Sequence, residues 1–159
     1  MLDKKNTAVL ASALVMTMLS GCDDTSISKQ SKQSELRSVH STKCSLGFIN
    51  DDGSMVTYAD GGSVRLVGWA ADSNTNTTPP QLNIVLTGPD GKSFVFEGAA
   101  RNDRPDVVKA FNQDGFLKSG FSLNLDVTAL QKATYSVSLQ MPTADNLITC
   151  KTNKILILK

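Results

Sequence analysis

The sequence predicts an all-β fold of two packed sheets, with about seven to nine short strands and one or two short helical turns. Short runs in which apolar and polar residues alternate recur along the chain, and Gly, Asn and Asp separate them at short intervals. Long helix-favouring stretches are scarce, as is typical of all-β proteins. A small β-barrel is the alternative architecture.

Residues 1–21 are expected to be an export signal with a helical apolar segment. Lys4 and Lys5 form its positive start, and residues 8–19 are mostly apolar. Ser20 and Gly21 are the small residues that a processing enzyme needs. Because a permanent membrane-spanning helix needs about twenty apolar residues, we expect this shorter leader to be removed.

The boundary between the leader and the following segment reads Leu19-Ser20-Gly21-Cys22, which resembles the lipobox of bacterial lipoproteins. In that family the cysteine receives a diacylglyceryl group and becomes the first residue of the mature chain, so the resemblance implies lipidation of Cys22. Two or more acyl chains hold a protein firmly at a membrane, whereas a single chain binds marginally. The alternative is an ordinary secretory signal with an unrelated cysteine.

Asp23 and Asp24 follow that cysteine directly. In the enterobacterial lipoproteins that this arrangement resembles, aspartate at this place favours retention in the inner membrane. The resemblance implies a lipid-anchored protein that faces the periplasm, at the inner rather than the outer membrane. The alternative is that the two acids only begin a soluble tether.

Residues 22–42 are expected to be the lipidated cysteine followed by a flexible tether. Ser, Gln, Lys and Thr predominate, and such a segment buries too little apolar surface to offset the entropy lost on ordering. A membrane-binding helix is the alternative, because Lys29, Lys32 and Arg37 could contact anionic lipid. His40 is the one histidine, and in a tether it is a poor candidate for a base or a metal ligand.

Residues 43–159 are expected to form a single β-sandwich domain. Residues 64–70 are apolar on both faces, which is typical of a central strand. The predicted strands are 45–49, 55–58, 64–70, 82–86, 94–97, 121–126 and 136–140, followed by 147–151 and 155–158 as one bent strand or two short ones.

Residues 103–111 break the strand pattern. Asp103, Pro105 and Asp106 precede an apolar spacing, so we predict one or two helical turns with Asp103 as the N-cap. A second short turn is predicted over 126–130.

Short motifs stand at Gly68-Trp69-Ala70, Arg104-Pro105-Asp106-Val107 and Ser119-Gly120-Phe121. They resemble landmarks of small immunoglobulin-like β-sandwich modules in bacterial exported and surface proteins. Leu130 to Tyr135 is similar to the Leu-x-x-Gly-x-Tyr corner of such sandwiches, with Ala133 in place of the glycine. The resemblance covers about residues 43–158 and implies a fold rather than a function, with the tyrosine hydroxyl bonded to nearby backbone.

Cys44 and Cys150 bracket nearly all the predicted strands. With Cys22 consumed by lipid they are an even pair in an oxidising compartment, so a disulfide is expected. It would close a loop of about a hundred residues, which the chain-entropy model associates with roughly 4–5 kcal/mol. Free thiols or a metal site are the alternatives.

The densest charge cluster consists of Arg101, Asp103, Arg104 and Asp106. These residues are the candidate binding site, as a contact for an anion, a glycan or a protein. The alternative is a structural role in which they cap a helical turn and pair their charges.

Residues 72–76 begin like a calcium-binding loop. Thr77 and Asn83 stand where that loop needs a glycine and a glutamate, so no metal site is expected. Residues 72–80 are better interpreted as a long polar loop, where binding surfaces often lie.

Trp69 is expected to lie in the core. Phe111, Phe116 or Phe121 could instead leave an exposed aromatic side chain for a partner, and the sequence does not rank them.

Residues 43–159 carry eleven Lys plus Arg and eleven Asp plus Glu, so nucleic acid is not an expected partner. They contain no histidine, no Gly-x-Ser-x-Gly motif and no phosphate-binding loop, so no catalytic residues and no cofactor are expected. We therefore expect a non-enzymatic, membrane-anchored envelope lipoprotein that binds an envelope protein or a cell-wall ligand, in one version as an exclusion or inhibitor protein. The alternatives are a structural accessory of a pilus, secretion or other envelope complex, and a carboxylate-dependent hydrolase.

Overall fold

A computed structural model of the chain describes residues 36–159. The predicted leader, Cys22, Asp23, Asp24 and most of the predicted tether lie outside these residues. The strands are β1 (Arg37–His40), β2 (Cys44–Ile49), β3 (Val56–Ala59), β4 (Ser63–Ala70), β5 (Asn83–Thr87), β6 (Ser93–Phe96), β7 (Ala100–Asn102), β8 (Gly120–Asp126), β9 (Thr134–Pro142) and β10 (Asn146–Leu158); the helices are α1 (Pro105–Phe111) and the 3-10 helix η1 (Asp114–Ser119).

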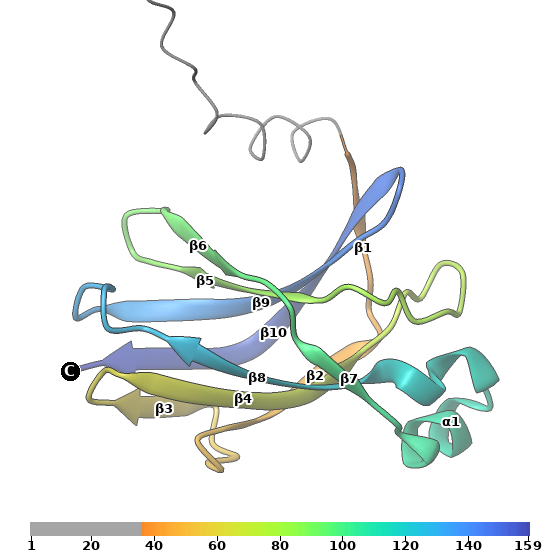
Figure 1. Cartoon of the computed structure of the whole chain (residues 1–159), viewed down its shortest axis with the longest axis horizontal. Coiled ribbons are helices and arrows are strands. Elements are labelled where there is room, and N and C mark those ends of the chain that lie inside the picture. Colours follow the sequence, from red (N-terminus) through yellow and green to blue (C-terminus); the bar gives the residue numbers. More distant parts are fainter. Residues whose placement is uncertain (1–35) are drawn as a thin grey trace, which may run out of the picture.

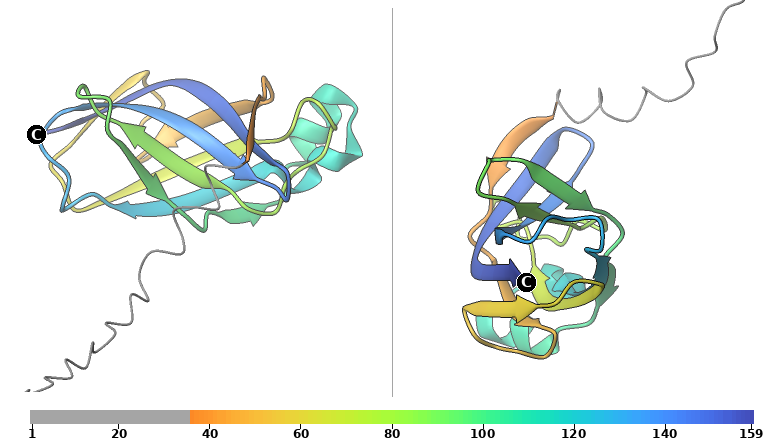
Figure 2. Two further views of the ribbon diagram at one scale, coloured as in Figure 1. Left: turned by 90° about the horizontal axis from the view of Figure 1, so that it is seen from above. Right: turned by 90° about the vertical axis from the view of Figure 1, so that its left-hand side faces the viewer.

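The strands form two sheets, here named sheet A and sheet B. Sheet A has six strands, in the order β1-β10-β9-β5-β6, with β3 also paired to β10. Sheet B has four strands, in the order β2-β4-β8-β7. The sheets lie as two layers, with α1 and η1 at the end away from the C-terminus (Figures 1 and 2). The predicted all-β, two-sheet architecture is confirmed, although the ten strands exceed the expected seven to nine.

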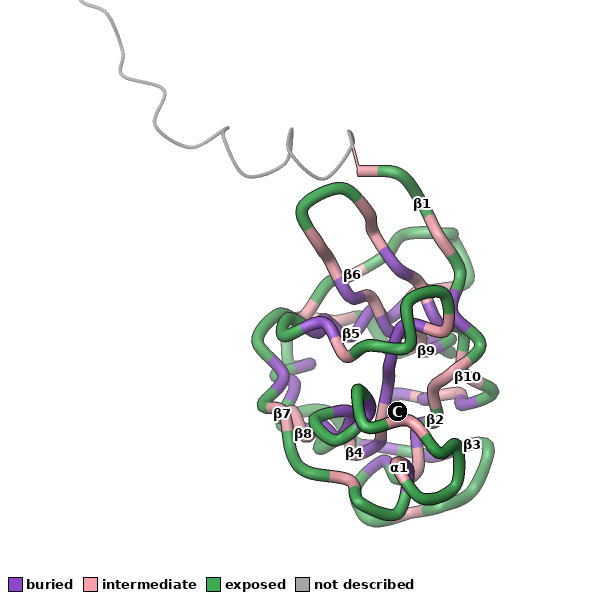
Figure 3. The backbone as a smooth tube through the Cα atoms, turned by 90° about the vertical axis from the view of Figure 1, so that its right-hand side faces the viewer, coloured by how far each residue is buried: buried purple, intermediate pink, exposed green. Residues whose placement is uncertain are grey.

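One apolar core lies between the sheets. Along β9, Tyr135, Val137, Leu139 and Met141 are buried, while the residues between them are exposed or half-buried. Inward side chains of β2, β4 and β8 meet those of β5, β9 and β10 in a single cluster. Buried positions therefore follow the strands, and most loops are exposed (Figure 3). Successive side chains of a strand point to opposite faces of the sheet. The predicted alternation of apolar and polar residues therefore places the apolar side chains in this core.

β4 lies between β2 and β8, as expected for a central strand. Its Gly68 passes so close to β2 that an added Cβ would overlap the Ser45 carbonyl oxygen and lie 2.9 Å from Cζ of Phe121. Glycine is therefore required at this position for the two strands to pair.

The fold begins earlier than the predicted tether boundary at residue 42. β1 pairs in parallel with β10, with Arg37 opposite Asn146 and His40 opposite Thr149. Its residues are mainly polar, and only Val39 packs against the core. Hydrogen bonding of the backbone, which is independent of side-chain polarity, places this segment in the sheet.

Two further differences concern strands. β7 was not predicted, because three residues are too few to show alternation. Residues 146–158 form one strand, β10, whose register shifts between Lys151 and Ile155. This confirms the interpretation of the C-terminal segment as one bent strand.

The predicted disulfide between Cys44 and Cys150 is present. It joins β2 of sheet B to β10 of sheet A, with the two Cα atoms 6.4 Å apart. Because the cysteines are 106 residues apart in sequence, the bond closes most of the described chain into one loop.

The Tyr135 hydroxyl donates a hydrogen bond of 2.8 Å to the Gln131 carbonyl oxygen. This is the local bond that the Leu130–Tyr135 motif predicts. It forms although Ala133 replaces the glycine of the motif, so the alanine is compatible with this corner.

A helix occurs where residues 103–111 predicted helical turns, but its cap differs from the prediction. α1 begins with Pro105 at its first position and has Arg104 as the N-cap residue, without a side-chain cap bond. Asp103 instead forms an ion pair with Lys118, at 2.5 Å between Nζ and Oδ1. Residues 126–130 form a single turn closed by the Leu130 N–H and the Val127 carbonyl, and η1 was not predicted.

Trp69 lies outside the main core, contrary to expectation. It is half-buried and packs with Val107 and Phe116 in a second, smaller cluster. The centroid of its ring is 5.5 Å from that of Phe111. Phe116 and Phe121 are buried, and Phe111 is 36% exposed, so Phe111 is the phenylalanine of the three that reaches the surface.

Candidate functional site

The side chains of the predicted cluster, Arg101, Asp103, Arg104 and Asp106, do not all pair with one another. Arg104 and Asp106 form a two-bond ion pair, at 2.8 Å from Nε to Oδ1 and 2.6 Å from Nη2 to Oδ2. Asp103 pairs with Lys118, and Arg101 turns inward. The structural alternative, in which these residues pair their charges, describes three of the four residues.

The Arg104–Asp106 pair is local and partly exposed. Its largest effect on Asp106 is the hydrogen bond from Arg104, which together with the guanidinium charge lowers the pKa of that carboxyl to about 2. Since Asp106 is exposed, solvent screens this pair and its contribution to stability is small.

The guanidinium group of Arg101 links three segments of the backbone through hydrogen bonds. Its Nη1 donates to the carbonyl oxygens of Ala70 and Ser119, each at 3.1 Å, and its Nη2 donates to the Pro79 carbonyl at 2.7 Å. All three partners are backbone carbonyls, and within residues 36–159 no carboxylate forms an ion pair with this guanidinium. Burial lowers the pKa of Arg101 to about 10, which leaves the side chain charged at neutral pH. Arg101 therefore fixes the end of β4, the end of η1 and the loop before β5.

That loop, residues 71–81, is built around the carboxylate of Asp72. Asp72 Oδ1 accepts hydrogen bonds from the backbone N–H and the side-chain amide of Asn74, both at 2.9 Å. Its Oδ2 accepts from the Thr75 hydroxyl at 2.8 Å. Burial acts to raise the pKa of Asp72, but these hydrogen bonds outweigh burial and hold the pKa below its usual value. The predicted polar loop is thus ordered by its own donors.

The same contacts bear on the calcium-like pattern of residues 72–76. Both oxygens of Asp72 accept hydrogen bonds from the loop itself. In residues 36–159, no group of three or more His, Cys, Asp or Glu side chains is placed to hold a metal ion.

Contacts from three directions hold the Asp72 loop in place. Ser41 Oγ donates to the Ala71 carbonyl at 2.6 Å, and Thr78 Oγ1 donates to the Gly115 carbonyl at 2.7 Å. An added Cβ at Gly115 would overlap the Asn76 carbonyl oxygen, so η1 approaches the loop as closely as a glycine allows. The loop is therefore held by the β1–β2 connection, by η1 and by Arg101.

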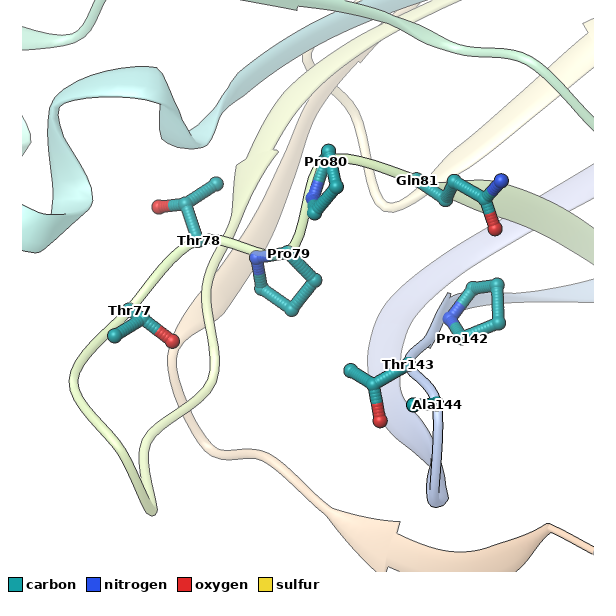
Figure 4. A pocket seen from close by; sticks show the side chains of 8 residues that line it. All are labelled: Thr77, Thr78, Pro79, Pro80, Gln81, Pro142, Thr143 and Ala144. Atoms are coloured by element: carbon teal, nitrogen blue, oxygen red, sulfur yellow. The ribbon is translucent and has the colours of Figure 1, made fainter.

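A groove of about 600 Å³ lies between this loop and the turn that joins β9 to β10. Figure 4 shows Pro79 of the loop facing Pro142 and Thr143 of the turn across it. The residues that line it are Thr77, Thr78, Pro79, Pro80, Gln81, Pro142, Thr143 and Ala144. Its volume is within the range of small-ligand sites.

The second wall of the groove is also fixed by hydrogen bonds. Thr143 exchanges bonds with Asn146: its N–H donates to the Asn146 carbonyl at 2.8 Å, and its Oγ1 accepts from the Asn146 N–H at 3.0 Å. The Arg37 N–H donates to the Asp145 carbonyl at 3.1 Å. The start of β1 therefore lies beside this wall.

The lining of the groove is uncharged and partly apolar. It consists of proline rings, one amide, one alanine and three threonines whose hydroxyls form hydrogen bonds within the protein, and the eight described residues that form it include no carboxylate, imidazole, thiol or amine. Such groups give apolar contact and neutral hydrogen bonds.

Sequence reasoning found one wall of this site and missed the other. Residues 72–80 were predicted as a long polar loop, where binding surfaces often lie, and residues 77–80 of this loop belong to the first wall. Pro142, Thr143 and Ala144 carry no signal of function, because they become a wall only when the sheet brings two distant segments together.

Comparisons with known proteins do not assign the chain to a family. No protein-family model matches the chain, and no curated protein is significantly similar to it. Among the helices of residues 36–159, none is long and apolar enough to cross a membrane.

Proposed function

We propose that this protein is a non-enzymatic envelope lipoprotein, anchored to a bacterial membrane through lipid on Cys22, whose domain is an immunoglobulin-like sandwich that binds a ligand in the groove. The ligand is a segment of an envelope protein or a cell-wall component. The groove is the single observation that carries the proposal, because both of its walls are held by internal hydrogen bonds and are ready to receive a ligand.

Four features support the proposed location in the cell and the type of sandwich. The lipobox resemblance at residues 19–22 supports lipidation, and Asp23 and Asp24 support the inner membrane. The Cys44–Cys150 disulfide suits an oxidising compartment such as the periplasm. The Tyr135–Gln131 bond supports the immunoglobulin-like type.

The place where the chain enters the described fold supports ligand binding close to the membrane. The described chain begins beside the β9–β10 turn, where Arg37 pairs with Asn146. About fifteen residues separate Cys22 from Arg37, and an extended chain of that length spans at most roughly 50 Å. The groove therefore opens at the tethered end of the domain, where it meets ligands within this distance of the lipid.

A bulky substitution in the groove tests the proposal. Ala144→Trp places an indole in the groove from an exposed turn, and Ala129→Trp is the matched control in another exposed turn. Each full-length variant is titrated against detergent-solubilised envelope proteins and against soluble cell-wall fragments. We expect saturable binding by the native protein and the control, and at least tenfold weaker binding by Ala144→Trp. Equal binding by Ala144→Trp, or no saturable ligand for the native protein, would contradict the proposal.

A further inference from the structure

β1 is held in sheet A by few contacts. It is four residues long, lies at the edge of the sheet, and pairs with β10 alone among the described strands. Val39 is its only residue that packs against the core, while Arg37, Ser38 and His40 are exposed. Segments with few buried apolar contacts open locally at a smaller free energy than core strands do. We therefore expect β1 to leave β10 while the rest of the domain stays folded.

The short connection after β1 holds the loop that forms the first wall of the groove. Ser41 lies in this connection and is buried. Its hydroxyl donates to the Ala71 carbonyl at 2.6 Å and accepts from the Ser73 N–H at 3.1 Å. The side-chain amide of Asn74 donates to the His40 carbonyl at 3.2 Å. The end of β1 and the connection are therefore bonded to the start of the Asp72 loop.

The start of β1 contacts the second wall. The Arg37 N–H donates to the Asp145 carbonyl at 3.1 Å, and Arg37 lies opposite Asn146 in the register. Asn146 in turn exchanges hydrogen bonds with Thr143, which lines the groove. β1 thus runs from the β9–β10 turn towards the Asp72 loop and is bonded to the segments of both walls (Figure 1).

The disulfide limits how far a release of β1 can spread. Cys44 begins β2 directly after the connection and is bonded to Cys150 of β10. A release that starts at β1 therefore stops at Cys44. Arg101 and η1 still hold the Asp72 loop at Pro79 and Thr78, so the loop loses its support at one end only.

We propose that β1 and residues 41–43 form a detachable strap, whose docking on β10 determines the order of both groove walls. When β1 leaves β10, residues 71–74 and the β9–β10 turn lose their bonds to the strap. A ligand that requires ordered walls then binds more weakly, because its apparent affinity falls with the docked fraction.

The role of the strap rests on the proposed function, because the order of the walls matters only if the groove binds a ligand. In that function the chain from the lipid anchor enters the fold at β1. A pull on the anchor therefore reaches β1 before any other described strand, and β1 couples the tether to the groove.

Hydrogen exchange of the full-length protein in detergent tests the strap without any ligand. Val39→Ser removes the one side chain that holds β1 to the core, and Val95→Ser is the matched control on β6, the four-residue strand at the other edge of sheet A. We expect Val39→Ser to speed exchange of the N–H groups of Ser73 and Thr143 roughly tenfold or more, while the Leu66 N–H in central β4 is unchanged.

The control separates this effect from general loosening of the sheet. Val95→Ser is expected to leave exchange at Ser73 and Thr143 unchanged. The proposal would be overturned by unchanged exchange at either group in Val39→Ser, by equal acceleration in both variants, or by equal acceleration at Leu66.

A covalent lock gives the opposite test. Ser38 and Leu147 are direct partners in the β1–β10 register, and neighbouring strands lie close enough for a disulfide. The oxidised double variant Ser38→Cys with Leu147→Cys, with the new bond verified by peptide masses, should slow exchange at Ser73 and Thr143 roughly tenfold relative to either single variant. Equal exchange in the locked protein and the single variants would mean that release of β1 does not govern the walls.

The strap and the proposed function fail on different results. A native protein without a saturable ligand contradicts the proposed function, whatever the exchange rates are. Exchange at Ser73 and Thr143 that does not respond to loosening or locking β1 contradicts the strap, even if the groove binds a ligand.

Discussion

Arg101 shows how the surroundings of a residue determine its role. A sequence cluster of two arginines and two aspartates suggests a ligand contact. The guanidinium of Arg101 instead donates hydrogen bonds to the carbonyls of Ala70, Pro79 and Ser119. Its Nε is buried without a hydrogen-bond partner in the described structure. Burying a cation without a full set of hydrogen-bond partners costs free energy. We infer that the structural role of Arg101 is to fix the three segments at one point.

Replacing Arg101 should therefore destabilise the whole domain. Arg101→Met leaves three carbonyl groups without their donor, and we expect a loss of roughly 3 kcal/mol in the free energy of unfolding. Arg65→Met is the control, because Arg65 forms an exposed ion pair with Asp51 and should cost less than about 1 kcal/mol. Urea denaturation measures both values. Equal effects of the two substitutions would contradict the structural role of Arg101.

The carboxylate of Asp72 is expected to stabilise the fold at neutral pH and to lose this effect in acid. Its pKa is lower in the folded chain than its usual value of 3.8. A carboxyl of this kind stabilises the fold above its unfolded pKa, and the contribution is lost as the pH falls through the folded pKa. Asp72→Asn should cost roughly 1–2 kcal/mol at pH 7, and the difference from the native protein should shrink below about pH 4.

Thermal unfolding between pH 2 and pH 7 checks this expectation. Asp145→Asn, at an exposed turn position, serves as the control for a simple change of charge. A destabilisation by Asp72→Asn that stays constant across the whole pH range would show that the carboxylate does not act through its protonation.

At the scale of elements, alternation predicted strands well where one face is buried. β8 and β9 have inward apolar residues such as Phe121 and Val137 between polar ones, and both strands were predicted. β1 was not predicted because its position in sheet A depends on backbone pairing with β10. Such pairing requires no pattern of side-chain polarity that the sequence could show. The N-cap of α1 was misassigned because Asp103 has a competing partner in Lys118, which only the folded chain brings near.

The disulfide is a covalent cross-link between the two sheets. Removing it with Cys44→Ser and Cys150→Ala should lower the free energy of unfolding by about 4–5 kcal/mol, because the closed loop is about a hundred residues long. Urea unfolding of the oxidised native protein and of the double variant measures the difference. A difference below about 1 kcal/mol would mean that other contacts already restrict the unfolded chain.

At the scale of the whole molecule, the two ends of the described fold carry different surfaces. One end holds the groove, the Asp72 loop and the start of β1, and the other holds β3 and the C-terminus (Figures 1 and 2). The groove could be predicted only in part, because its walls lie near residues 79 and 143 and meet only through the order of strands in sheet A. Residue types alone do not specify that order.

In the proposed function, the lipid anchor on Cys22 determines which of these ends faces the membrane, so the account depends most on Cys22. Mass spectrometry of the N-terminal peptide of the natural protein tests this directly. The account predicts a mature chain that begins at Cys22 and carries a thioether-linked diacylglyceryl group. A mature protein with a free thiol at Cys22, or an intact precursor that still begins at Met1, would contradict it.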